Sequence, residues 1–483
     1  MEHLFDKLER YGNSDIYPYH MPGHKRQVFG ELPKEFFQRD ITEIDGFDNL
    51  HQPEGILLEL QDRAAALCGA EESFYLVNGS TGGILSAVSA AVPFGGHILM
   101  TRNCHKSAYH AAYLRKLKIS YLYPDVLQDY DIYEAVTPAQ VCLALEKEKD
   151  IDAVLVVSPT YEGRIANIRE IAAVVHEKGI PLIVDEAHGA HLGLNSLIHE
   201  NSCRAGADIV IQSTHKTLPA LTQTALLHVN GNRINRELLK RFLHIYQTSS
   251  PSYLLMASID NALSFVERKG SEAFGELVRQ YGEMQKRLSH CRHLSFLQPD
   301  EEKQDIGKLV ISTKYTDITG KQLYDILLEK YHLQMEMATE SYTLAMFTIG
   351  DSSPGYERLT GALLEIDEKL FSKVKAETDK EIDDFVITED KSAEDALPLS
   401  EAWDAETEEI PLDEAAGRYV GEFVNLYPPG VPVLVPGERM SEKLARRIVV
   451  WLKQGLTVQG IKIRKDEYLI QVLKVVHGKQ SLE

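Results

Sequence analysis

Three nearly uninterrupted apolar runs, each followed by polar residues, constrain the fold of this chain most strongly. They are DAVLVVSP (152–159), IPLIVDEAH (180–188) and ADIVIQSTHK (207–216), and helical patterns such as 167–179 lie between them. A strand without polar alternation is buried on both faces, as in a parallel sheet covered by helices. We therefore expect an α/β protein with a mostly parallel sheet, and we expect ligands to bind where the strands end.

The residue pattern and composition predict several units along the chain of 483 residues, as expected for this length. Polar clusters predict an N-terminal arm over 1–55, and the alternation of strands and helices predicts a large domain over 56–260. A smaller α+β domain is predicted over 261–371, and residues 372–414 are rich in acids, as in a linker. The last compact unit is 415–483.

Charge and cysteine content exclude several classes of protein. Lys and Arg total 51 against 72 Asp and Glu, so the net charge of −21 argues against binding to nucleic acid or to an anionic membrane. This charge is compatible with a cationic substrate. Five scattered cysteines without a CxxC pair argue against a disulfide framework or a zinc site. The cysteine pattern also favours a reducing cytoplasm. The most apolar run, 84–100, is interrupted by Pro93 and His97, so we expect a soluble protein.

Three polar features at the ends of predicted strands are typical of one cofactor. Ser80, Thr81 and Gly82 begin a helix, where hydroxyl and backbone N–H groups can hold a phosphate. Asp185 ends one apolar run, and Lys216 follows another. Pyridoxal phosphate needs a lysine that bonds to its aldehyde, an acid at its ring nitrogen and an anchor for its phosphate. The sequence predicts this cofactor, with an ordinary solvated Lys216 as the alternative.

Several strings then identify a family. The chain resembles the Orn/Lys/Arg decarboxylases through PYHMPGHKR (18–26), NGSTGG (78–83), RNCHKS (102–107), VDEAHGAH (184–191), STHKTLPALTQ (213–223) and YPPGVPVLVPGE (427–438). The resemblance implies a large domain of the aspartate-aminotransferase-like type I pyridoxal-phosphate fold, with smaller α+β C-terminal domains. It also implies a homodimer or a higher homo-oligomer. Since PGHK stands at 22–25, the chain resembles the short form of the family, without an N-terminal wing domain.

The resemblance assigns roles to individual residues. It implies three catalytic residues: Lys216 as the lysine bonded to the cofactor, Asp185 at the ring nitrogen and His105 stacked on the ring. It implies phosphate contacts for Ser80, Thr81, Ser213 and His215, with Gly82 in the glycine loop, and positions near the ring for Thr160 and His188. Glu438 would bind the cationic end of the substrate.

The implied reaction is decarboxylation of a basic L-amino acid, a step towards polyamines, with arginine favoured over lysine and ornithine. An aminotransferase, an aldolase-like lyase and a catalytically silent regulatory homologue stay open as alternatives. A metal site at Asp185, His188 and His191 is disfavoured because no motif such as HExxH accompanies them. The arm segment 18–26 and TSSPSY (248–253) are expected to reach an active site shared across a dimer.

Overall fold

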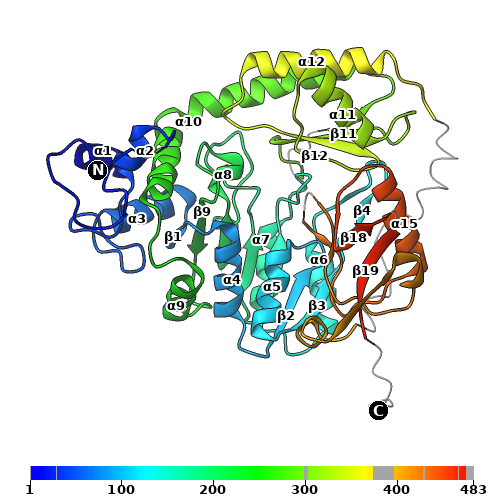
Figure 1. Cartoon of the computed structure of the whole chain (residues 1–483), viewed down its shortest axis with the longest axis horizontal. Helices are drawn as coiled ribbons and strands as arrows, with labels where there is room; N and C mark the ends of the chain where they lie inside the picture. The colour runs from blue at the N-terminus through cyan, green and yellow to red at the C-terminus, as the bar shows by residue number, and fades with distance from the viewer. Residues whose placement is uncertain are drawn as a thin grey trace.

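The computed structural model describes residues 2–28, 30–298, 303–373, 396–427, 430–465 and 467–474. A seven-stranded sheet forms the centre of the large domain, in the order β1-β9-β8-β7-β6-β2-β3 (Figure 1). Its strands are β1 (Glu72–Leu76), β2 (His97–Thr101), β3 (Lys118–Leu122), β6 (Ala153–Val157), β7 (Leu182–Asp185), β8 (Ile209–Gln212) and β9 (Ala225–Val229). Four of its pairings are parallel, and β9 runs antiparallel to both of its neighbours. The expected mostly parallel sheet is confirmed.

Helices cover both faces of this sheet, which explains the uninterrupted apolar runs. Alternate residues of a strand point to opposite faces. Thus Leu155 of β6 packs in one apolar cluster with α4, α5 and α9, whereas Val154 and Val156 pack in another with α6 and α7. These helices are α4 (Gly79–Ala91), α5 (Lys106–Arg115), α6 (Pro138–Lys147), α7 (Ile168–Glu177) and α9 (Arg236–Tyr246).

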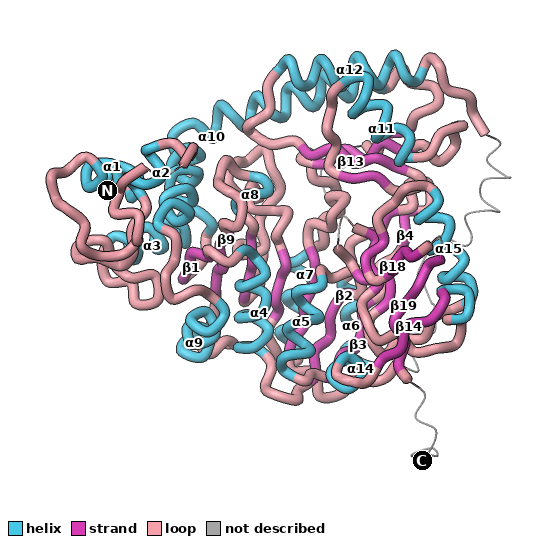
Figure 2. Tube along the Cα trace, in the orientation of Figure 1, coloured by secondary structure: helices cyan, strands magenta, loops and turns pink. Residues whose placement is uncertain are grey.

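A helix of 36 residues, α10 (Tyr253–Leu288), connects the large domain to the small one. The predicted boundary after residue 260 therefore falls inside a continuous helix. The small domain has an antiparallel sheet of β10 (Ser295–Phe296), β11 (Lys308–Ser312), β12 (Met337–Ala338) and β13 (Tyr342–Met346), covered by α11 (Gly320–Tyr331) and α12 (Ser353–Asp367) (Figure 2). Neither α10 nor any other described helix is long and apolar enough to cross a membrane.

The C-terminal unit begins earlier than the sequence predicts. Its elements are α14 (Leu399–Trp403), β14 (Thr407–Pro411), η2 (Leu412–Glu414), β15 (Val424–Leu426), β16 (Pro432–Leu434), α15 (Glu442–Lys453), β17 (Val458–Gln459), β18 (Ile461–Arg464) and β19 (Glu467–Leu473). β14 pairs with β19, although it lies in the predicted acidic linker. Its acid Glu409 pairs with Lys462 and Arg464 of β18, so an acidic stretch forms a strand here. Of the rest of the predicted linker, residues 374–395 lie outside the described residues.

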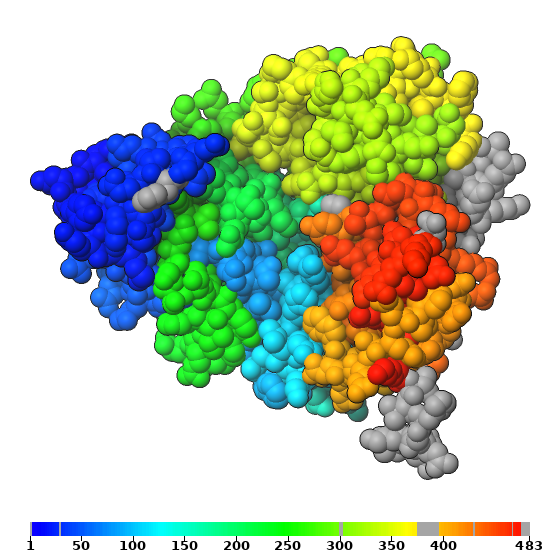
Figure 3. Space-filling view, in the orientation of Figure 1, coloured from blue at the N-terminus to red at the C-terminus, as the bar shows by residue number. Residues whose placement is uncertain are grey.

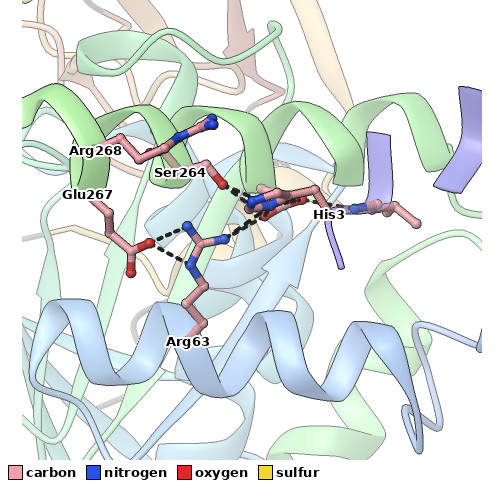
Figure 4. A network of polar contacts seen from close by, with 7 residues as sticks. His3, Arg63, Ser264, Glu267 and Arg268 are labelled. Carbon is pink, nitrogen blue, oxygen red and sulfur yellow. Dashed lines mark hydrogen bonds and ion pairs between the residues drawn. The ribbon is translucent and has the colours of Figure 1, made fainter. Parts of the chain in front are cut away.

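The N-terminal arm is anchored by a polar network on α10 (Figure 4). The arm contains α1 (Leu4–Gly12) and α2 (Lys34–Arg39), and α3 (Ile56–Cys68) follows it. The side chain of Asp260 on α10 is only 1% exposed and accepts hydrogen bonds from the Leu4 N–H at 3.0 Å and from Arg63 at 2.9 Å. Arg63 also pairs with Glu267, about two helical turns further along α10. One buried carboxylate thus fixes the start of the arm to two helices.

We expect Asp260→Asn to loosen the arm, because Arg63 and the Leu4 N–H lose a buried negative acceptor. The free energy of unfolding in urea should fall by about 2 kcal/mol, and limited proteolysis should cut within residues 1–55 faster. Glu267→Gln is the matched control, since it removes the exposed partner of the same arginine and should change stability much less. Equal effects of the two substitutions would contradict the anchoring role.

Candidate active site

A cavity of about 570 Å³ lies where the large domain, the small domain and the C-terminal unit meet. These three parts are in contact in the space-filling view (Figure 3). The cavity lies at the carboxyl ends of the parallel strands, since Val157 ends β6, Asp185 ends β7 and both line it. Six of the predicted site residues line this cavity: Ser80, His105, Asp185, His188, His215 and Lys216.

Asp185 is a buried acid that faces the cavity. It is 6% exposed, and its Oδ1 accepts a hydrogen bond from the Ala187 N–H at 3.1 Å. Burial raises its pKa, while the charge of Lys216 opposes this shift. Within the described part of the chain, Asp185 forms no ion pair. A cationic N–H inside the cavity would therefore stabilise its carboxylate, and the protonated ring nitrogen of pyridoxal phosphate is such a group.

Lys216 lies in the short helix α8 (Thr214–Thr217), which begins directly after β8 and Ser213. Its Nζ is 3.1 Å from Nε2 of His188. Burial lowers its pKa, although Asp185 acts in the opposite direction. A lowered pKa increases the fraction of neutral amine, which is the nucleophilic form. This environment fits a lysine that bonds to an aldehyde.

His105 is the N-cap residue of α5, and its ring faces the cavity. Its Nδ1 accepts a hydrogen bond from the Ser107 N–H at 3.2 Å, so the proton of the neutral ring is on Nε2. Burial lowers its pKa to about 4. His105 therefore carries an uncharged, flat ring near neutral pH, as a residue stacked on an aromatic cofactor would.

The first turn of α4 supplies a candidate phosphate site. Ser80 lines the cavity, Thr81 is exposed beside it, and Gly82 is buried. Gly79 begins the helix with a φ of +66°, in the left-handed region that favours glycine. The Oγ of Ser213, between β8 and α8, is fully buried and has no hydrogen-bond partner among the described residues. A helix N-terminus and hydroxyl groups are suited to a phosphate.

Two predicted site residues lie behind the cavity wall. Thr160 is buried, and its Oγ1 accepts a hydrogen bond from the Arg164 N–H at 3.1 Å. Glu438, the predicted substrate acid, is 2% exposed and pairs with Arg102 at 2.9 Å. Arg102 itself lines the cavity. Glu438 therefore does not face the cavity as predicted. The reason is electrostatic, because the buried guanidinium of Arg102 requires a carboxylate partner and Glu438 provides it.

Several residues of the cavity region were not among the predicted site residues. Glu336, at the end of the loop before β12, lines the cavity and accepts a hydrogen bond from the Tyr161 hydroxyl. Glu162 also lines it and accepts one from the Tyr342 hydroxyl at 2.9 Å. Lys308, the first residue of β11, bonds to His188. Only the contacts between domains reveal these roles, although a lysine at the start of the apolar strand 308–312 is a local signal.

We expect Glu438→Gln to lower the free energy of unfolding by about 3 kcal/mol, because it leaves the buried guanidinium of Arg102 without its carboxylate. Urea denaturation measures this change. Glu442→Gln is the matched control, since Glu442 pairs with Arg446 at the surface of the same unit. Unchanged stability together with a much higher KM would instead support direct binding of the substrate by Glu438.

Comparisons with known proteins identify the family of the chain. The Orn/Lys/Arg decarboxylase major domain matches residues 2–356, and the C-terminal domain of that family matches residues 387–460. Arginine decarboxylase of Bacillus subtilis is 30% identical over 495 residues, which cover 99% of each chain.

Solved structures support the fold. The lysine decarboxylase LdcF of Francisella novicida matches with a TM-score of 0.81 at 17% identity, covering 98% of this chain and 81% of that one. A serine palmitoyltransferase of Sphingomonas wittichii matches with a TM-score of 0.52 at 16% identity, covering 64% of this chain and 75% of that one. The large domain has the type I pyridoxal-phosphate fold. The chain belongs to the Orn/Lys/Arg decarboxylase family.

Proposed function

We propose that this protein is a pyridoxal-phosphate-dependent decarboxylase of a basic L-amino acid, with arginine as the favoured substrate. The observation that carries the proposal is the placement of Lys216, Asp185 and His105 on the wall of one cavity. When bound, the cofactor supplies an electron sink for the bond between Cα and the carboxylate. Asp185 would keep the proton on its ring nitrogen, and His105 would lie against its ring.

The charges of the cavity wall support a cationic substrate. Asp131, Glu162 and Glu336 line the wall in addition to Asp185. Asp131 is neutralised by Lys314 at 2.8 Å, but Glu336 accepts its hydrogen bond from the neutral Tyr161 hydroxyl. Glu336 therefore offers a carboxylate to the distal ammonium or guanidinium group of a substrate. We infer that Glu336, rather than Glu438, is the first acid to test for this contact.

The arginine content of the cavity favours decarboxylation over transamination. An aminotransferase holds the α-carboxylate with an arginine, whereas a decarboxylase must not stabilise the carboxylate that leaves. Arg102 is the only arginine on the described cavity wall. Its guanidinium already donates to Glu438, to the carbonyl oxygens of Pro432 and Val433 and to the Tyr109 hydroxyl. These partners neutralise the charge of Arg102, so it does not attract the carboxylate of a substrate.

Arginine is favoured because full-length relatives from Bacillus subtilis and Bacillus anthracis are named arginine decarboxylases. A planar guanidinium also pairs with a carboxylate through two parallel hydrogen bonds, which an ammonium cannot do. We expect the enzyme loaded with pyridoxal phosphate to release CO₂ and agmatine from arginine, with much lower kcat/KM for lysine and ornithine. Chromatography of the amines formed from the three amino acids measures this. A keto acid product would support an aminotransferase instead.

Lys216→Ala is the critical variant of this assay. Turnover should fall by several orders of magnitude, because a covalent catalyst is removed. Borohydride reduction followed by mass spectrometry should attach the cofactor to the peptide containing Lys216 in the wild type only. Lys314→Met is the matched control, since it removes a buried lysine that pairs with Asp131 and should keep this modification. Near-normal turnover of Lys216→Ala would rule out the proposed chemistry.

We also propose that the chain forms a homodimer through its arm. The segment 16–21 exposes four apolar side chains, including Tyr19 at 90% and Met21 at 64%. Such exposed apolar area marks an interaction surface. The double substitution Tyr19→Asp and Met21→Asp should weaken the dimer in sedimentation-velocity experiments, whereas Leu143→Asp, at an equally exposed leucine of α6, should not. An active wild-type monomer would contradict a shared site.

A further inference from the structure

His188 joins two buried lysines from different domains. Its Nε2 is 3.1 Å from Nζ of Lys216, and its Nδ1 is 2.9 Å from Nζ of Lys308. His188 follows β7 in the large domain, while Lys308 begins β11 in the small domain. These hydrogen bonds, from Lys216 to His188 and from His188 to Lys308, therefore connect the candidate cofactor lysine to a residue outside the cavity wall.

The side chain of Lys308 is enclosed by its neighbours on all sides. Lys308 is fully buried, at 0% exposure. Its side chain packs against Gly163, where a Cβ atom would lie only 2.7 Å from the Cγ of Lys308. Its Nζ lies 5.8 Å from the centre of the Tyr161 ring, and the carboxylate of Asp305 contributes a nearby negative charge. Burial lowers the pKa of Lys308 to about 8, against this charge.

The hydrogen bonds of His188 restrict the charges of the two lysines. Burial, followed by the charges of Lys308 and Lys216, lowers the pKa of His188 well below its usual value, so the ring is neutral. A neutral imidazole has one N–H donor and one acceptor nitrogen. An ammonium group can only donate, so one lysine can be an ammonium beside the acceptor nitrogen. The other lysine must be a neutral amine that accepts the N–H.

The surroundings indicate that Lys308 is the ammonium. Its Nζ is 2.9 Å from Nδ1 of His188, a distance that allows a charge-assisted hydrogen bond. The face of the Tyr161 ring and the carboxylate of Asp305 both stabilise a cation at this position. His191, whose Nε2 is 2.9 Å from Oδ1 of Asp305, lowers the pKa of this carboxyl group against the effect of burial. The second nitrogen of His188 then carries the proton and donates it towards Lys216.

We propose that Lys308 is a positioning residue for the cofactor lysine: it donates to Nδ1 of His188, which places the imidazole proton on Nε2 and maintains Lys216 as a neutral amine. This inference rests on the proposed function of Lys216. As a neutral amine, Lys216 would have the lone pair that bonds to the aldehyde carbon of the cofactor. Its two amine protons would leave with the carbonyl oxygen as water. An ammonium lacks the lone pair for this attack.

Other charged and titratable groups also act on Lys216. The carboxylates of Asp185 and Glu336 raise its pKa, and burial of the side chain lowers it. Six titratable groups lie around Lys216. They come from β7 and the loop after it, α5, α8, β11 and the loop before β12, and they are Asp185, His188, His105, His215, Lys308 and Glu336. Removing the positive charge of Lys308 and its effect on His188 should therefore raise the pKa of Lys216.

Competitive acetylation of the cofactor-free chain tests this inference without any turnover. The rate of acetylation of each lysine is followed against pH by mass spectrometry, with exposed lysines of the same sample as the reference. We expect an apparent pKa of Lys216 below the ordinary value of about 10.4 in the wild type. Lys308→Met, which keeps most of the length of the side chain but not its charge, should raise it by at least one unit. The rate at which Lys216 takes up pyridoxal phosphate at pH 7 should then fall about tenfold.

Two further variants separate the role of His188 from a simple effect of charge or packing. Lys308→Arg keeps a cationic donor and should restore much of the low pKa. His188→Gln removes the ring that connects the two lysines, so Lys308→Met should shift the pKa of Lys216 much less in this background. The double-mutant cycle measures that difference. Lys314→Met is the matched control, a buried lysine beside β11 that pairs with Asp131 and not with His188.

The inference is overturned if wild-type Lys216 titrates at the ordinary value. This test needs only the wild-type chain, so it can be made even if Lys308→Met fails to fold. It is also overturned if Lys308→Met shifts the pKa equally with and without His188. Failure of the proposed function is distinguishable, because it would show as absent amine product from wild-type enzyme in which Lys216 has its low pKa.

Discussion

The site depends on the burial of an acid and an amine at the same edge of one sheet. Asp185 ends β7 and Lys216 follows β8, and these neighbouring parallel strands bring both groups into one cavity. Among the described residues no ion pair joins the two, so both groups can interact with a molecule bound in the cavity. Burial raises the pKa of Asp185 and lowers that of Lys216, and the charge of each opposes the shift of the other. A bound group that presents an N–H to the acid and an aldehyde to the amine satisfies both.

The sheet and the predicted cofactor residues could be read from the sequence because their signals are local. The apolar strand 152–159, buried on both faces, and the glycine turn before α4 each reveal their structure within a few residues. The polar residues at the strand ends follow from the rule that parallel strands present their carboxyl ends together. The resemblance to a family then assigned Lys216, Asp185 and His105, and all three line the cavity.

The remaining residues could not be predicted because their roles arise from contacts between distant parts of the chain. Lys308 is 120 residues from His188, and Glu336 is 175 residues from Tyr161. The acidic pattern of 407–411 resembled a linker because its partner strand, β19, lies some sixty residues later in the chain and basic residues of β18 neutralise Glu409. In each case the decisive factor is a tertiary partner of opposite charge or matching hydrogen-bond capacity.

Arg102 shows how the C-terminal unit becomes part of the cavity. Its guanidinium, on the large domain, donates to the carbonyl oxygens of Pro432 and Val433 and to the carboxylate of Glu438, all in the C-terminal unit. This buried charge loses much of its stabilisation if either part moves, because only the Tyr109 hydroxyl would remain as a partner. Arg102 and Val433 both line the cavity, so the same bonds that join the two parts also set its shape. A neutralised arginine can thus hold the wall in place without attracting the carboxylate that the proposed reaction must release.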